Sequence, residues 1–324
     1  MGVSTETDSH TWPSLPFEAW SETCATLHRW LQIVGKIRLS QTRWLNHGWH
    51  VALYVTPSGL TTSSIPYGDR IFEIEFDFVH HRLALQTSDG GSAGFALEPQ
   101  SVAMFYARLM QQMATLGLQV RIHPKPNEML DAVRLDEDET HCAYDREYAN
   151  RFWRVLVQAD RVFKEFRARF IGKCSPVHLF WGAPDLAVTR FSGRSAPRHP
   201  GGIPNLPDWV TQEAYSHEVS SCGFWPGGDG IPYAVFYSYA YPEPADFSMA
   251  PVRPAAAFYS PELREFLLPY DVVQQSPSPD ATLLDFLQTS YEAAAKLAQW
   301  DRDALERDPD PRSAALSAAH RPGA

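Results

Sequence analysis

The sequence predicts an α+β protein of two related halves, each with an antiparallel sheet and flanking helices, and a pocket at their junction. Three observations lead to this prediction. Short strands with turn residues between them follow one another in both halves. Long segments with apolar residues at helical spacing open and close each half. The order of these signals in the first half returns in the second.

The first half, residues 12–123, begins with a helix that Gly35 is expected to end. Its clearest strand covers residues 72–79, where apolar and acidic residues alternate, a pattern that predicts one buried and one polar face. The predicted elements of this half are a helix at 16–34, strands at 51–55, 60–65, 72–79 and 83–87, a helix at 101–116 and a strand at 119–123.

A polar, acidic and proline-containing run at 124–142 is predicted to link the halves. The second half, residues 143–305, begins with another long helix. A tail at 306–324, rich in Ala, Pro, Arg and Asp, is predicted to be disordered. The predicted elements of the second half are a helix at 144–171, strands at 177–181, 186–191 and 233–241, and a helix at 280–305.

A shared pattern predicts an internal duplication. In each half, a long helix ending in a Gly-Lys step, at 35–36 and at 172–173, is followed by a strand with a histidine at its entry. These histidines are His50 and His178. Two units of one design would pair about a pseudo-twofold axis, so both imidazoles would approach the junction. Chance similarity stays open as the alternative, because identity between the halves is low.

The chain has 324 residues, with 28 Lys+Arg against 38 Asp+Glu and a formal net charge of -10. With 44% hydrophobic and 20% charged residues, it has the composition of a globular protein. The acidic balance argues against a nucleic-acid or membrane-surface binder, because phosphate groups are held by clustered Lys and Arg. We therefore expect a small-molecule ligand or substrate as partner, and neither nucleic acid nor membrane.

Neither a signal peptide nor a membrane span is expected. Residues 1–10 are polar, and no run approaches the ~18 apolar residues of a membrane-spanning helix. The cysteines are scattered without CxxC spacing, which argues against a thiolate zinc site or a redox pair. We expect a cytoplasmic protein with four reduced thiols, at Cys24, Cys142, Cys174 and Cys222.

The candidate chemistry is centred on His50, His178, His217 and Glu218. Imidazole and carboxylate are ligands that Fe, Mn or Zn accept, so these residues would form a divalent metal site. Without a metal, Glu218 would orient His217 as a general base. An adjacent His and Glu converge in a loop but point to opposite sides of a strand. His47 and Glu75 are reserve members of this centre.

Cationic and aromatic residues are candidates for substrate binding. Arg190 and Arg194 offer planar forks to a carboxylate or phosphate, and Lys36 and Trp225 are further candidates. The leading hypothesis is an enzyme acting on a small polar or anionic molecule, either a hydrolase or an oxidoreductase. The alternatives are a non-catalytic ligand-binding or interaction protein, and histidines and arginines that serve only the fold.

Three segments resemble an uncharacterised bacterial family of about this length, a domain of unknown function. They are residues 46–51 (NHxWHV), 175–182 (SPVHxFWG) and 215–227 (YSHEVSSxGFWPG). The resemblance extends over residues 12–305 and implies no particular activity.

Two departures from the family pattern flank His47. Gly48 stands where the family usually has an aromatic residue, and residues 41–44 replace an expected proline-rich approach. A pocket at this point would therefore differ in selectivity from that of other members.

Overall fold

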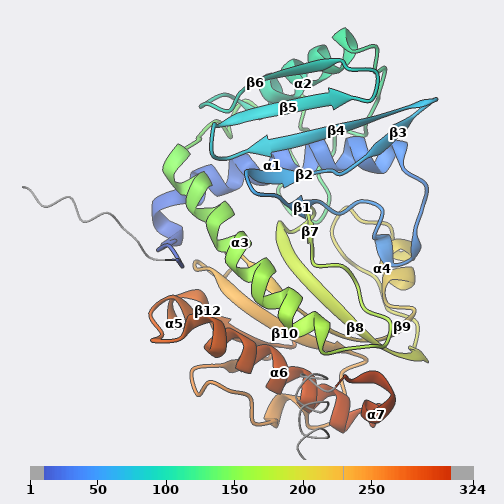
Figure 1. The fold of residues 1–324 in the computed structure, drawn as a ribbon, viewed down its shortest axis with the longest axis vertical. Coiled ribbons are helices and arrows are strands. Elements are labelled where there is room, and N and C mark those ends of the chain that lie inside the picture. The colour runs from blue at the N-terminus through green and yellow to red at the C-terminus, as the bar shows by residue number, and fades with distance from the viewer. Residues whose placement is uncertain (1–10, 229, 308–324) are drawn as a thin grey trace, which may run out of the picture.

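A computed structural model describes residues 11–228 and 230–307 of the chain. Over these residues the protein has an α+β fold with two six-stranded antiparallel sheets, as the sequence predicts (Figure 1). The N-terminal sheet has the strand order β1-β2-β4-β5-β6, with β3 paired to β4. The C-terminal sheet has the order β11-β12-β10-β9-β8-β7.

Helices α1 (Phe17–Gln41) and α2 (Val102–Thr115) pack against the N-terminal sheet. The alternation predicted for its central strand is confirmed, because the apolar residues Phe72, Ile74 and Phe76 are buried while the acidic residues between them keep solvent contact. The strands are β1 (Tyr54–Val55), β2 (Gly59–Thr61), β3 (Ile65–Tyr67), β4 (Arg70–Asp77), β5 (Arg82–Thr87) and β6 (Ser92–Ala96).

Helices α3 (Arg146–Ala168) and α6 (Pro279–Leu297) cover one face of the C-terminal sheet and lie in front of it in Figure 1. Its strands are β7 (His178–Phe180), β8 (Asp185–Ser195), β9 (His217–Trp225), β10 (Val235–Tyr241), β11 (Phe258–Ser260) and β12 (Glu265–Pro269). The short elements are η1 (Asn46–Gly48), α4 (Asp208–Ala214), η2 (Phe247–Met249), α5 (Tyr270–Gln274) and α7 (Arg302–Leu305).

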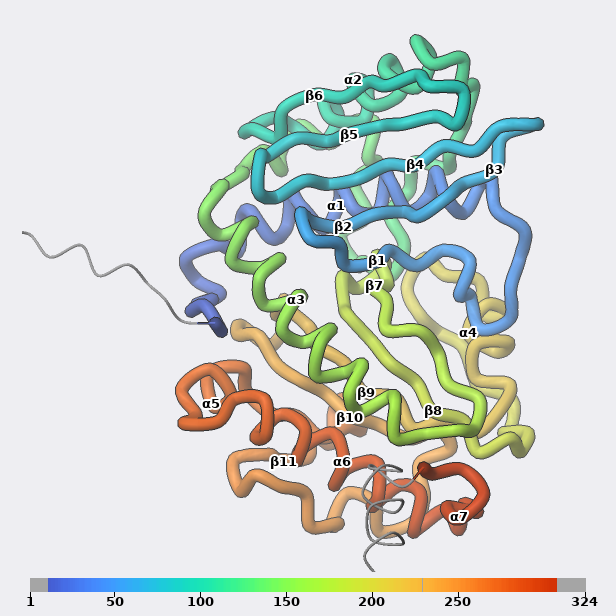
Figure 2. The backbone as a smooth tube through the Cα atoms, viewed as in Figure 1, coloured from blue at the N-terminus to red at the C-terminus, as the bar shows by residue number. Residues whose placement is uncertain are grey.

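The two sheets meet edge to edge, where β1 and β7 run side by side in Figure 2. Leu53 and Leu179 exchange both backbone hydrogen bonds, each 2.8 Å long. The Trp181 indole donates to the Val51 carbonyl at 2.9 Å, and buried apolar side chains of both halves form one continuous core. Equivalent strands at the junction are what a duplication would produce, but the duplication and the domain limits stay predictions.

Three predictions of secondary structure are wrong, two of them at helix ends. Helix α1 continues past Gly35 to Gln41, because this glycine is buried against the Trp181 indole, and its missing side chain serves close packing rather than helix termination. Residues 119–123 form no strand. The closing helix stops at Leu297, and α7 follows as a separate turn.

Strand β9 is missing from the predicted elements, because the sequence left strand and loop open at His217 and Glu218. Its Ser, Cys and Gly residues have low strand propensity, and only pairing with β8 and β10 makes the segment extended. Strands β6, β11 and β12 were also missed. Most of the predicted disordered tail lies outside the described residues, and none of the described helices has the length and apolar character of a membrane span.

The Gly35→Ala variant tests the packing at the junction. Replacing glycine by alanine normally stabilises a helix by ~1 kcal/mol. Here the new methyl group would overlap the Trp181 indole, so we expect the free energy of unfolding in urea to fall by about 1–3 kcal/mol. The Ala19→Gly variant, on the exposed side of the same helix, measures how far an exchange of glycine and alanine changes stability through helix propensity alone. A G35A protein at least as stable as the parent would contradict this contact.

Candidate functional site

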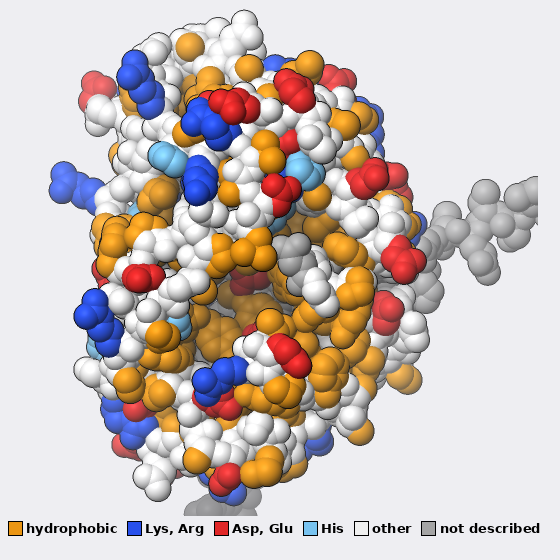
Figure 3. All heavy atoms as spheres, turned by 180° about the vertical axis from the view of Figure 1, so that it is seen from behind, with side chains coloured by type: hydrophobic (Ala, Val, Ile, Leu, Met, Phe, Trp, Pro, Cys, Tyr) orange, Lys and Arg blue, Asp and Glu red, His pale blue; other side chains and the backbone are white. Residues whose placement is uncertain are grey.

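A hollow lies over the face of the C-terminal sheet that α3 and α6 leave uncovered. Figure 3 shows this side of the molecule, with mainly hydrophobic side chains lining the hollow and acidic side chains within it. Side chains alternate along a strand, so the register identifies the residues of this face. Its rows are Asp185, Trp225 and Val235, then His178, Ala187, Gly223, Tyr237 and Leu267, and then Thr189, Ser221, Tyr239 and Glu265. We call this face the cleft.

A tyrosine lies flat across the floor of the cleft. The Tyr237 hydroxyl donates a hydrogen bond to the Asp185 carboxylate, two strands away. Its ring passes over Gly223, where a Cβ atom would overlap the hydroxyl oxygen. The absence of a side chain at position 223 therefore allows the Tyr237–Asp185 contact.

A pair of tyrosines lies at the end of the cleft that holds Glu265. Tyr215, which follows α4, has its hydroxyl 2.8 Å from that of Tyr239 on β10. Burial raises the pKa of Tyr239 to about 12 and places the pKa of Tyr215 well above its ordinary value. Both hydroxyls are therefore protonated at neutral pH, and because one of them donates to the other, the pair leaves one O–H that can donate to a ligand.

Three carboxyl groups of the cleft have raised pKa values. Burial raises the pKa of Asp185 to about 6, against the opposing effect of the Tyr237 hydrogen bond. Burial and then the charge of Asp185 raise the pKa of Glu128 to about 7 and that of Glu265 to about 8. All three residues keep solvent-accessible surface. Their carboxyl groups are therefore surrounded by the walls of a concave site without being enclosed. Within residues 11–228 and 230–307, none of the three forms an ion pair.

Helix α1 holds the loop that carries Glu128. The Gln32 amide exchanges two hydrogen bonds of 2.8 Å with the backbone of Asn127, and Lys36 donates to the Asn127 side chain. Glu128 follows with φ of +60°, and its carboxylate lies against Gly182. Lys36, predicted to bind substrate, is thus occupied with the loop, and burial lowers its pKa to about 8.

The predicted metal centre does not form. His217 and Glu218 project from opposite sides of strand β9, and Glu218 pairs with Arg194 at 2.6 Å. The His50 ring accepts a hydrogen bond from its own loop, at the backbone amide of Leu45. In the described part of the chain, no three His, Cys, Asp or Glu residues are grouped to hold a metal ion.

His178 is fully buried on the cleft face, paired across the strands with Ala187. Neither ring nitrogen has a hydrogen-bond partner among the described residues. The ring is surrounded by Trp49, Tyr54 and Phe180. Burial lowers its pKa to about 3, so this imidazole is neutral.

The reserve residues lie in two different places. His47 donates from Nδ1 to the Ala214 carbonyl at 2.9 Å and accepts from Lys173 at Nε2, at 2.6 Å. Its ring centroid is 6.0 Å from that of His217, so these two histidines do meet. Glu75 lies on the N-terminal sheet and accepts hydrogen bonds from Thr56 and Ser58.

The predicted arginines make internal contacts. The Arg190 guanidinium is buried between the rings of Phe166 and Tyr291, 3.5 and 4.2 Å from their centroids. Arg194 is paired with Glu218. Of the predicted substrate-binding residues, Trp225 is the one that lines the cleft, where it packs beside Tyr237.

The acidic residues of the cleft have only weak signals in the sequence. Asp185 reads as a turn residue after Pro184, and Glu128 and Glu265 resemble ordinary surface acids. The alternation of Tyr237, Tyr239 and Tyr241 was the available clue, because hydroxyl-bearing rings at every second position indicate a partly polar sheet face.

A model described as a family of unknown function, DUF5996, matches residues 12–307. The chain belongs to this family. The match covers most of the chain and confirms the predicted resemblance. No curated protein and no solved structure matches the chain.

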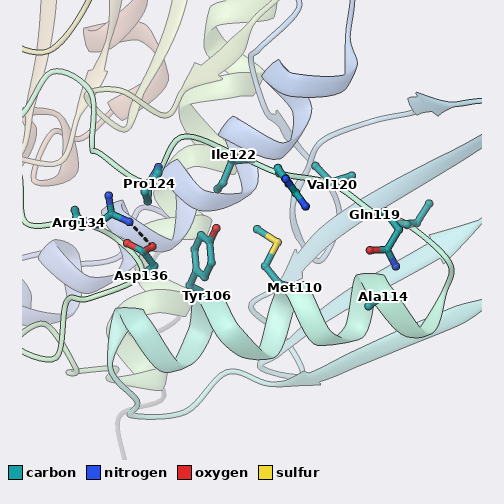
Figure 4. Close-up of a pocket in the computed structure, with 11 residues that line it drawn as sticks. Tyr106, Met110, Ala114, Gln119, Val120, Ile122, Pro124, Arg134 and Asp136 are labelled. Atoms are coloured by element: carbon teal, nitrogen blue, oxygen red, sulfur yellow. Dashed lines mark hydrogen bonds and ion pairs between the residues drawn. The ribbon is translucent and has the colours of Figure 1, made fainter.

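Two other depressions each contain an ion pair between an arginine and an aspartate. One, of about 380 Å³, lies between α2 and residues 118–124, and the Arg134–Asp136 ion pair closes one end of it (Figure 4). The other, of about 580 Å³, contains Asp280, which is bound by Arg161 at 2.6 Å. Because the unpaired carboxyl groups lie in the cleft, we assign the chemistry to the cleft.

The raised pKa of Glu265 predicts a dependence of stability on pH. A carboxyl group with a higher pKa in the folded chain stabilises the fold while it is protonated, and this contribution is lost as pH rises from about 4.5 to about 8. The Glu265→Gln variant has no carboxyl group at this position, so this fall in stability with rising pH is absent from it. We expect the stability difference, E265Q minus parent, to become more positive between pH 5 and 8.5 in urea unfolding. Val235→Ala, which titrates nothing, is the control, and an E265Q difference as flat as that of V235A would refute the raised pKa.

Proposed function

We propose that this protein binds a small polar organic molecule in the cleft and exchanges protons with it through Asp185, Glu128 and Glu265. The observation that carries this proposal is a set of three carboxyl groups without an ion-pair partner among the described residues. Asp185 and Glu265 belong to the sheet face that Trp225 and Tyr237 line, and Glu128 lies on the neighbouring loop. Several acids elsewhere on the described chain do pair with arginine, as Asp89 does with Arg70. Unpaired and crowded groups are common in functional sites.

The protonation states give the cleft both donors and acceptors near neutral pH. With a pKa of about 6, Asp185 is mainly ionised at pH 7, and with a pKa of about 8, Glu265 is mainly protonated. The hydrogen-bonded pair of Tyr215 and Tyr239 adds one further O–H donor. A polar ligand with several hydrogen-bonding groups can be oriented by such a set.

A second candidate function is catalysis by the same groups. Two carboxyl groups with separated pKa values can act as base and acid on one substrate, here Asp185 as base and Glu265 as acid. This proposal keeps the enzyme that the sequence suggests but transfers its chemistry from histidines to carboxyl groups. The proposal also abandons the anionic substrate that the sequence suggests, because three acidic side chains would repel an anion.

A fragment screen tests the binding proposal. We expect saturation-transfer NMR at pH 7.5, on a set of neutral polyols, aromatic alcohols, amines, amino acids and carboxylates, to identify binders. Their signals should fall at least fivefold in Asp185→Asn, which removes an ionised acceptor and alters the Tyr237 contact. Glu75→Gln, in the other sheet, is the matched control. Binders that respond equally to D185N and E75Q, or an absence of binders, would contradict the proposal.

A further inference from the structure

We infer that the ligand of the cleft is an aliphatic organic ammonium ion, held by Glu128, Asp185 and Glu265 with its carbon chain on the aromatic wall. This inference rests on the proposed function and names its ligand class.

The first argument is the unused cation next to the site. Arg264 directly precedes Glu265, yet its guanidinium pairs with Glu243 at 2.8 Å. Arg264 lies in the turn before β12, with φ of +60°, and its guanidinium is engaged by Glu243 rather than by an acid of the cleft. Lys36, near the loop of Glu128, is bound to Asn127 instead. The described chain therefore leaves the negative charge of the cleft uncompensated, and a positively charged ligand would compensate it.

The second argument is the composition of the wall. Val235, Tyr237 and Leu267 form an apolar cluster separate from the main core, with Trp225 and Tyr239 packed against it. The rings of Tyr237 and Tyr239 are stacked, with centroids 6.0 Å apart. Aliphatic chains and ammonium groups both bind aromatic faces, the latter through cation–π attraction. A ligand that fits this wall has an apolar body as well as a charge.

The third argument is the unpartnered imidazole. His178 is fully buried, stands in the row of Gly223 and Tyr237, and has two ring nitrogens without partners among the described residues. A neutral imidazole has one acceptor nitrogen, which suits an N–H donor. The neighbouring Trp49 and Tyr54 give it ring contacts only. An acceptor nitrogen on this side of the sheet is compatible with a ligand that carries an N–H group.

The fourth argument separates an organic cation from a metal ion. A metal ion needs several ligand atoms within ~2–2.6 Å of one centre, and the described residues contain no such group. The three carboxyl groups still affect one another electrostatically through Asp185. Acids spread along a wall match an extended cation with more than one N–H donor.

Calorimetric titration of the full-length protein with 1,5-diaminopentane tests the inference. The matched probes are 1-aminopentane, with one charge, and 1,5-pentanediol, with none. At pH 8.5 we expect the affinity to decrease from the diamine to the monoamine to the diol, with the diamine bound at least tenfold more tightly than the diol. The affinity should fall at least tenfold at pH 6, because protonation of Glu128 and Glu265 removes their charge. The other titratable groups that act on these acids are Asp185 and the hydroxyls of Tyr215, Tyr237 and Tyr239.

Variants decide whether the diamine binds at this site. Glu265→Gln removes one charge and relieves repulsion, so the variant should fold, and we expect at least tenfold weaker diamine binding. Glu75→Gln should bind as the parent does. Diol binding at least as tight as diamine binding and sensitive to D185N would reject the ammonium class but retain the cleft. Diamine binding unchanged in E265Q and D185N would overturn the inference, and loss of all binding, fragments included, would overturn the proposed function as well.

Discussion

A six-stranded antiparallel sheet has two faces, and in this protein the helices α3 and α6 cover only one face of the C-terminal sheet. Strand alternation then divides the side chains of the sheet into two sets. Phe224 and Phe236 belong to the covered face and enter the main core, while Trp225 and Tyr237 belong to the other. The uncovered face can be partly polar because no helix must pack on it. The position of the acids and tyrosines in the cleft follows from this arrangement.

The N-terminal half completes the cleft from one side. Its sheet is joined to the C-terminal sheet by the backbone pairing of Leu53 with Leu179. Helix α1 then reaches the loop at Asn127 through Gln32 and Lys36, and this contact brings Glu128 to Gly182. The buried polar residues of α1 thus have a structural task that also positions a charge of the cleft. The two halves therefore contribute to a single site.

Local patterns predicted the fold where they were strong. The alternation around Phe76 gave a strand with the correct buried face, and the family resemblance is confirmed. Gly35 was misread because its role depends on the distant Trp181. The histidine centre failed because the chain is extended at His217, which separates this residue from Glu218. The acids of the cleft were missed because crowding in three dimensions, rather than sequence context, raises their pKa values.

The most direct measurement of the central claim is a carbon-detected NMR titration of the side-chain carboxyl groups, with resonances assigned through Asp185→Asn and Glu265→Gln. Crowding without a cation predicts a pKa of about 6 for Asp185 and about 8 for Glu265, and a downward shift of the Glu265 pKa when Asp185 is neutralised. Ordinary carboxyl pKa values, near 4 for both groups, would contradict the account.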